Sequence, residues 1–90
     1  MASNRNRVDQ YSIVKQYIDE LDYLDLLANH APADEFEEES KEISAKITGS
    51  LNVQEIAWII AEVFNRRFTD NNAPDRFMGC AEKIYRALHR

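Results

Sequence analysis

Apolar residues recur at helical spacing along almost the whole chain. The first run places them at positions i, i+3, i+7 and i+10, namely Tyr11, Val14, Ile18 and Leu21. This run predicts an amphipathic helix over about Val8–Leu21. A shorter apolar group predicts a second helix over residues 23–29. Pro32 ends it, because the residue before a proline disfavours helical backbone angles.

A capping box predicts the start of a third helix. Asp34 is a typical N-cap residue and Glu37 stands three positions later, so each side chain can bind a backbone N–H group of the first turn. We expect this helix to run to about Ile47, with Gly49 behind it as a left-handed cap. One face carries the candidate core residues Phe36, Ser40, Ile43 and Ile47.

A second capping box, Asn52 with Glu55, predicts a fourth helix over about Val53–Phe68. A turn then leads to Pro74, whose fixed φ suits the first position of a helix, and a fifth helix is expected to reach about Leu88. The candidate core residues of the fourth helix are Val53, Ile56, Ala57, Ile60, Val63, Phe64 and Phe68. Those of the fifth are Phe77, Cys80, Ala81, Ile84 and Leu88.

No segment alternates with the period of a strand, and no linker divides the 90 residues. The chain is therefore expected to be all-α, a single small bundle of four to five helices. Residues 1–7 are polar and are expected to form a disordered or frayed N-terminus, with residues 8–90 as a single helical domain. One cysteine excludes an internal disulfide, and no apolar run is long enough to cross a membrane, so we expect a cytoplasmic protein.

Negative charge is concentrated in the first half of the chain. Residues 19–42 carry ten acids and only one base, Lys41, whereas residues 1–18 and 43–90 each have a small positive excess. Such a block attracts basic partners, and it is also typical of a solvated surface that keeps a small domain soluble. Both interpretations stay open here. The candidate partner-binding acids are Asp22, Asp25, Asp34, Glu35, Glu38, Glu39 and Glu42, of which the last four are spaced as one helical stripe.

Four stretches of the chain contain short motifs, and the residues of these motifs are helix caps and core positions. Ile18–Leu27 matches parts of the pattern I-x-E-W-D-P-x-x-L-L, and Pro32–Phe36 matches parts of P-x-D-E-Y. Ile59–Phe64 with Phe68 is similar to I-x-x-V-F-x-x-x-F, and Cys80–Ile84 to a shorter form of C-x-x-I-A-E-K-I. In these stretches the chain resembles a bacterial family of small domains of unknown function.

The resemblance spans roughly residues 13–85, with Leu21 where the family has tryptophan and Tyr23 where it has proline. It implies a small all-α bundle and supplies no activity. In size and charge, though not in motif, the chain is also similar to the small acidic helical proteins that include bacterial immunity proteins.

Histidine and cysteine, which serve in nucleophilic and zinc sites, are sparse. Cys80 lies on the predicted apolar face of the last helix, where a thiol acts as a small apolar group. The two histidines, His30 and His89, have no second ligand at metal-binding spacing. We therefore expect no enzyme, no cofactor and no metal site. The pI of about 4.9 also disfavours nucleic acid as a partner.

Trp58 lies outside the apolar stripe of the fourth helix, on the side of Glu62 and Asn65. Either this helix is covered on several sides, so that Trp58 and the adjacent Ile59 belong to the core, or Trp58 anchors an interface. We favour the core position, because an exposed apolar patch is a liability unless it is used. Trp58 nevertheless joins the acids above as a candidate partner-binding residue.

Two functional hypotheses follow from these observations. The first is a non-enzymatic binding protein that engages a basic protein partner with its acidic helical surface, with an immunity or antitoxin protein as the concrete form. The alternative is a self-associating structural or regulatory domain, in which Trp58 and Ile59 form a contact between helices of a homodimer. A small enzyme or metal-binding protein is the third and least supported. Neither nucleic acid nor membrane is an expected partner.

Overall fold

The computed structural model of the chain describes residues 2–30, 35–48 and 51–89, without the side chains of residues 2–9 and Asp25. These ranges contain four α-helices, two 3₁₀ helices and no strand. The α-helices are α1 (Ala2–Leu21), α2 (Glu37–Lys46), α3 (Val53–Phe68) and α4 (Met78–Leu88), and the 3₁₀ helices are η1 (Tyr23–Asp25) and η2 (Pro74–Phe77). The predicted all-α bundle is confirmed.

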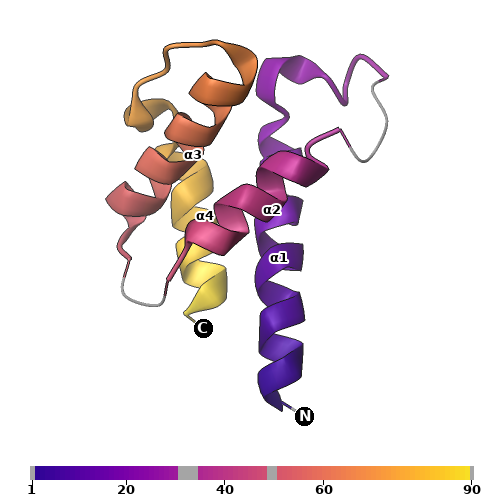
Figure 1. Cartoon of the computed structure of the whole chain (residues 1–90), viewed down its shortest axis with the longest axis vertical. Coiled ribbons are helices and arrows are strands. Elements are labelled where there is room, and N and C mark those ends of the chain that lie inside the picture. Colours follow the sequence, from indigo (N-terminus) through magenta and orange to yellow (C-terminus); the bar gives the residue numbers. More distant parts are fainter. Residues whose placement is uncertain (1, 31–34, 49–50, 90) are drawn as a thin grey trace.

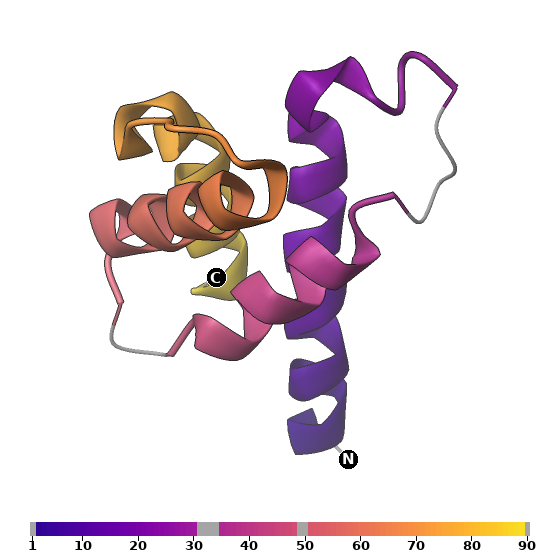
Figure 2. The same cartoon turned by 45° about the horizontal axis from the view of Figure 1, so that its top comes forward.

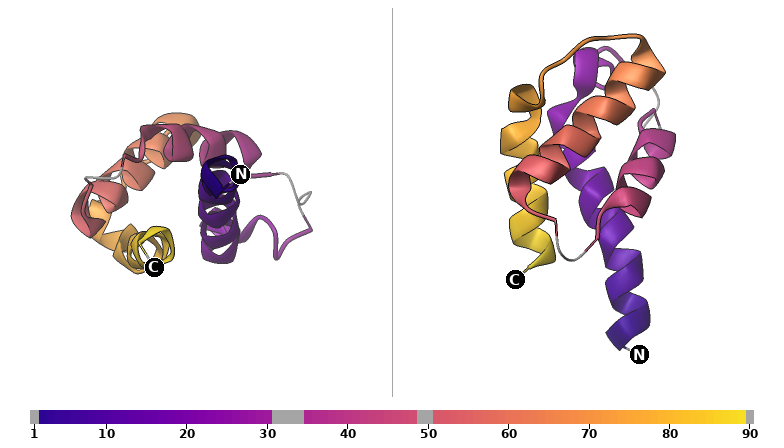
Figure 3. Two further views of the ribbon diagram at one scale, coloured as in Figure 1. Left: turned by 90° about the horizontal axis from the view of Figure 1, so that it is seen from below. Right: turned by 60° about the vertical axis from the view of Figure 1, so that its left-hand side comes forward.

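The four α-helices alternate in direction around one core. In Figure 1, α1 and α3 rise, whereas α2 and α4 descend. Seen from below, the helices follow one another around an arc with α1 and α4 at its two ends (Figure 3). Helix α1 packs on α2 and α4, and α3 packs on α2, α4 and η2. The N-terminal part of α1 extends below the rest of the bundle (Figure 2).

Helix α3 begins and ends where the sequence predicts. The Asn52 side chain accepts a hydrogen bond from the Glu55 N–H at 2.8 Å, and the Glu55 carboxylate accepts one from the Asn52 N–H at 2.9 Å. These two bonds complete the predicted capping box. The predicted core residues of α3 are buried or half-buried, so this helix presents an apolar face to three neighbouring elements.

Helix α2 begins at Glu37, later than predicted, and its N-cap residue Phe36 provides no side-chain hydrogen bond. Asp34 and Gly49, the predicted caps, lie outside the described residues. The predicted inner face is confirmed by the burial of Phe36, Ser40, Ile43 and Ile47.

The predicted helix over residues 23–29 is wrong. The chain forms only η1 and a turn there, because Asp22 and Leu24 have left-handed φ values of 50° and 62°. The Asp22 carboxylate accepts hydrogen bonds from the backbone N–H groups of Leu27 and Ala28, at 2.7 and 2.9 Å. These two hydrogen bonds give backbone N–H groups of the turn an acceptor, and so stabilise the turn that replaces the helix.

Two further boundaries differ from the prediction. Helix α1 begins at Ala2 rather than at about Val8. The predicted fifth helix is divided at Phe77 into η2 and α4. Pro74 does stand at the beginning of η2, as its fixed φ predicts.

The core is organised around the ring of Phe64. It lies 4.5 Å from the ring of Tyr23 in η1, in a stacked arrangement. Further rings surround it: Phe36 before α2 at 6.0 Å, Phe68 at 5.7 Å and Phe77 of η2 at 5.8 Å. Phe64 therefore joins segments that are far apart in the sequence.

Replacing Asn52 with alanine is expected to lower the free energy of unfolding by about 1 kcal/mol, because the Glu55 N–H loses its acceptor. For a domain of this size the melting temperature should fall by roughly 4–8 °C, measured by circular dichroism. Asn71→Ala, at an exposed loop position, is the control. An equal decrease in both variants would contradict the capping role of Asn52.

Candidate functional site

The predicted acidic stripe is divided in the structure. Glu42 forms ion pairs with Arg66 and Arg67 of α3 and lies 3.6 Å from Lys46, so its charge is compensated within the molecule. Partial burial raises the pKa of the Glu42 carboxyl, but the hydrogen bonds from Arg67 and Arg66 outweigh it and hold the pKa below its ordinary value. Glu42 therefore connects α2 to α3.

Glu39 is the second departure from the stripe. Glu39 as a whole is only 8% exposed, and its Oε1 atom is buried with no hydrogen-bond partner among the described residues. The expectation that Glu39 lies on an exposed stripe is wrong. It stands next to the fully buried Ser40 on the inner face of α2, so that a partner protein has little access to it.

Glu35 and Glu38 of the predicted stripe remain at the start of α2, and together with Glu37, which was not part of the stripe, we call them the α2 acidic surface. Lys41 lies 3.5 Å from Glu37 and 3.8 Å from Glu38, and the two carboxylates raise the pKa of its amine. Two glutamates thus share one lysine, and the Glu38 side chain is 68% exposed. The backbone of Asp25 is described but not its side chain, and Asp34 lies outside the described residues.

Trp58 is 57% exposed, so the core position that we favoured for it is wrong. Its neighbours Ile59 and Ala61 are buried at 8% and 3% exposure. Neighbouring elements therefore cover α3 on several sides, as the first explanation requires, but they leave Trp58 exposed. Ile59 points into the protein and is not available for the predicted contact between copies.

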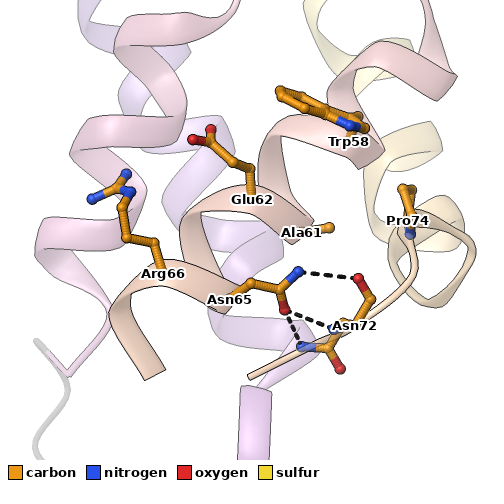
Figure 4. A pocket seen from close by; sticks show the side chains of 7 residues that line it. All are labelled: Trp58, Ala61, Glu62, Asn65, Arg66, Asn72 and Pro74. Carbon is orange, nitrogen blue, oxygen red and sulfur yellow. Dashed lines mark hydrogen bonds between the residues drawn. The ribbon is translucent and has the colours of Figure 1, made fainter. Parts of the chain in front are cut away.

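Trp58 stands on the rim of an open groove of about 390 Å³. Five residues of α3 line it at positions i, i+3, i+4, i+7 and i+8: Trp58, Ala61, Glu62, Asn65 and Arg66. This spacing belongs to one face of a helix. Asn72, which precedes η2, and Pro74, the first residue of η2, form the opposite wall (Figure 4).

The wall of this groove is held to α3 by a side-chain network. The amide oxygen of Asn65 accepts hydrogen bonds from the Asn72 backbone N–H at 2.8 Å and from its side chain at 2.9 Å, and the Asn65 amide donates to the Asn72 carbonyl at 3.1 Å (Figure 4). Asn72 also donates to the Tyr23 hydroxyl at 2.6 Å. That hydroxyl donates to Asp70, and Arg76 lies 5.0 Å from the centre of the Tyr23 ring. The groove is therefore a preformed feature.

The charges around the groove differ from those of the α2 acidic surface. Glu62 lies 3.3 Å from Lys46, and Glu42 pairs with Lys46 and with the two arginines. This cluster between α2 and α3 contains three cations and two carboxylates, of which Arg66 and Glu62 line the groove. The sequence placed Trp58, Glu62 and Asn65 on one side of the helix, but it contained no signal that Asn72 and Pro74 would lie against them.

Cys80 is the one cysteine, and its thiol lies 3.5 Å from the Tyr17 carbonyl. Burial, the largest effect, raises the pKa of this thiol to about 12, although Lys83 nearby lowers it in part. Within the described parts of the chain, no three histidine, cysteine or acidic residues gather as a metal site would require. Over the same residues, no helix is both long and apolar enough to cross a membrane.

No protein-family profile, no curated protein and no solved structure matches the chain. The resemblance to a bacterial domain family therefore stays a prediction from the sequence.

The raised pKa of Cys80 predicts how stability depends on pH. The folded state favours the neutral thiol, so this contribution is complete below the ordinary pKa of 9.0 and is lost as the pH rises towards about 12. We expect the free energy of unfolding, measured with urea, to decrease over this range and to decrease less in Cys80→Ala. Tyr23, whose pKa is raised mainly by burial, acts in the same direction in both proteins. Identical slopes in the two proteins would contradict the prediction.

Proposed function

We propose that this chain is a non-enzymatic binding domain that engages a basic protein partner through the α2 acidic surface. The observation that carries the proposal is the distribution of ion pairs. Glu42 is matched by three cations, whereas Glu37 and Glu38 share Lys41. Of the predicted stripe, the start of α2 therefore keeps the uncompensated negative charge.

The position of these glutamates is compatible with a stable fold. They stand before and within the first turn of α2, where negative charge interacts favourably with the helix dipole. Exposed carboxylates in this arrangement attract lysine and arginine over a distance and then bind them by charge-assisted hydrogen bonds. The net charge of −5 acts in the same direction.

The concrete form of this proposal is an immunity or antitoxin protein that neutralises a basic toxin in the cytoplasm. Its support is the small size, the acidic surface and the lack of a sequence pattern for catalysis. The single cysteine, a partly buried free thiol, suits a reducing compartment.

Neutralising the α2 acidic surface tests this function. In the triple variant Glu35→Gln, Glu37→Gln, Glu38→Gln, we expect at least about a tenfold loss in the amount of a basic protein captured from an extract of the source cells. Capture by the unmodified chain should weaken with added salt, since the contact is electrostatic. Mass spectrometry identifies the captured protein, and a nuclease assay with the purified pair tests the toxin interpretation.

A matched variant separates this surface from net charge. Glu20→Gln, Asp75→Asn and Glu82→Gln remove the same three charges from exposed positions on α1, η2 and α4. Capture should survive in this variant. Equal losses in both triple variants, with both proteins folded by circular dichroism, would reduce the acidic surface to a solubility feature.

A further inference from the structure

The outer face of α3 is a second surface with its own composition. Elements α2, α4 and η2 cover the other sides of this helix, and the groove residues occupy the side that remains. Trp58 stands at one end of this face and Arg66 at the other, eight residues along the helix and therefore roughly 12 Å apart in rise. Between them lie Glu62 and Asn65, whereas Ala61 lines the groove but is only 3% exposed.

Each end of this face carries an exposed side chain that can bind a partner. The Trp58 indole is open to solvent, and the Arg66 side chain is 51% exposed although its guanidinium pairs with Glu42. A guanidinium can bind a carboxylate in its own plane and stack an aromatic ring on its face at the same time. Arg66 can therefore take an indole without releasing Glu42.

The two ends are complementary to each other. When two copies of α3 lie antiparallel, Trp58 of each copy meets Arg66 of the other, so a single two-fold axis satisfies both ends at once. Glu62 lies midway between them and faces its equivalent across the axis, where Lys46 of its own chain, 3.3 Å away, offsets the like charge. We propose that the groove face of α3 binds a second copy of this chain in this antiparallel arrangement.

The charges favour this occupant over the basic partner of the α2 acidic surface. Two of the residues that line the groove are charged, Glu62 and Arg66, one of each sign, so the groove offers a basic protein no excess of negative charge. A second copy supplies a guanidinium for the exposed Trp58 indole, and an indole for the face of the Arg66 guanidinium while its edge stays bound to Glu42. The proposal is independent of the proposed function, because it uses different residues.

Sedimentation equilibrium of the full chain, combined with Trp58 fluorescence, tests the dimer. Because the interface is about one helix wide, we expect weak association, with a dissociation constant on the order of 100 μM. Emission from Trp58, the only tryptophan, should shift to the red as the dimer dissociates on dilution. A monomer at about 1 mM, ten times the expected dissociation constant, would overturn the proposal, as would a dimer whose emission does not change.

Two variants test the arrangement. Trp58→Ala and Arg66→Glu should each weaken association about tenfold or more, whereas Arg86→Glu should leave it unchanged. Arg86 is a fitting control because it is also an exposed arginine paired with a glutamate, Glu82, but on α4. If Arg86→Glu weakened association equally, the dimer would depend on overall charge and not on this face.

Mixing the two interface variants gives the sharpest result. A mixed dimer of Trp58→Ala with Arg66→Glu retains one intact pair, the tryptophan of the second variant against the arginine of the first. The mixture should therefore associate more strongly than either variant alone. A purely structural role of these residues, or binding of an acidic protein to the same face, predicts no such recovery. Absence of recovery overturns the antiparallel arrangement.

Discussion

The stacking of Tyr23 on Phe64 is the contact on which most of the structure depends. To bring Tyr23 into the core directly after α1, the chain must turn within a few residues, and it does so with left-handed backbone at Asp22 and Leu24. Each such residue costs about 1–2 kcal/mol. Burial of Tyr23 and its ring contact with Phe64 offset a cost of this size, since they contribute roughly 2 and 1 kcal/mol. Leu24, left 49% exposed, follows from the same turn.

The same tyrosine connects the core to the surface. Its ring is 1% exposed, yet its hydroxyl takes part in the network of Asp70 and Asn72, and Asn72 in turn is bound to Asn65. The wall of the Trp58 groove is thus fixed by hydrogen bonds that start at a core residue. A buried hydroxyl needs such partners, and here they also position the loop between α3 and η2.

The helical periodicity and caps predicted the all-α class, the bounds of α3 and the inner face of α2, because each depends on local spacing. The segment after α1 was mispredicted, since its apolar residues have helical spacing but Tyr23 packs on a ring 41 positions away in the chain. Glu39 and Trp58 were misplaced for a related reason. Residue type predicts average burial, whereas the side that a neighbouring helix covers is decided by tertiary packing.

The ion pairs between α2 and α3 place the two proposed surfaces apart. Lys46 meets Glu62 and Glu42 meets Arg66, so the two helices run antiparallel along this seam. The start of α2, with Glu37 and Glu38, therefore lies towards the end of α3, whereas Trp58 lies towards its beginning. The cations of α3 compensate the charge of Glu42, and one of them, Arg66, also lines the groove. One set of internal contacts thus separates a negative surface from an aromatic one of balanced charge, and a single partner chemistry cannot suit both.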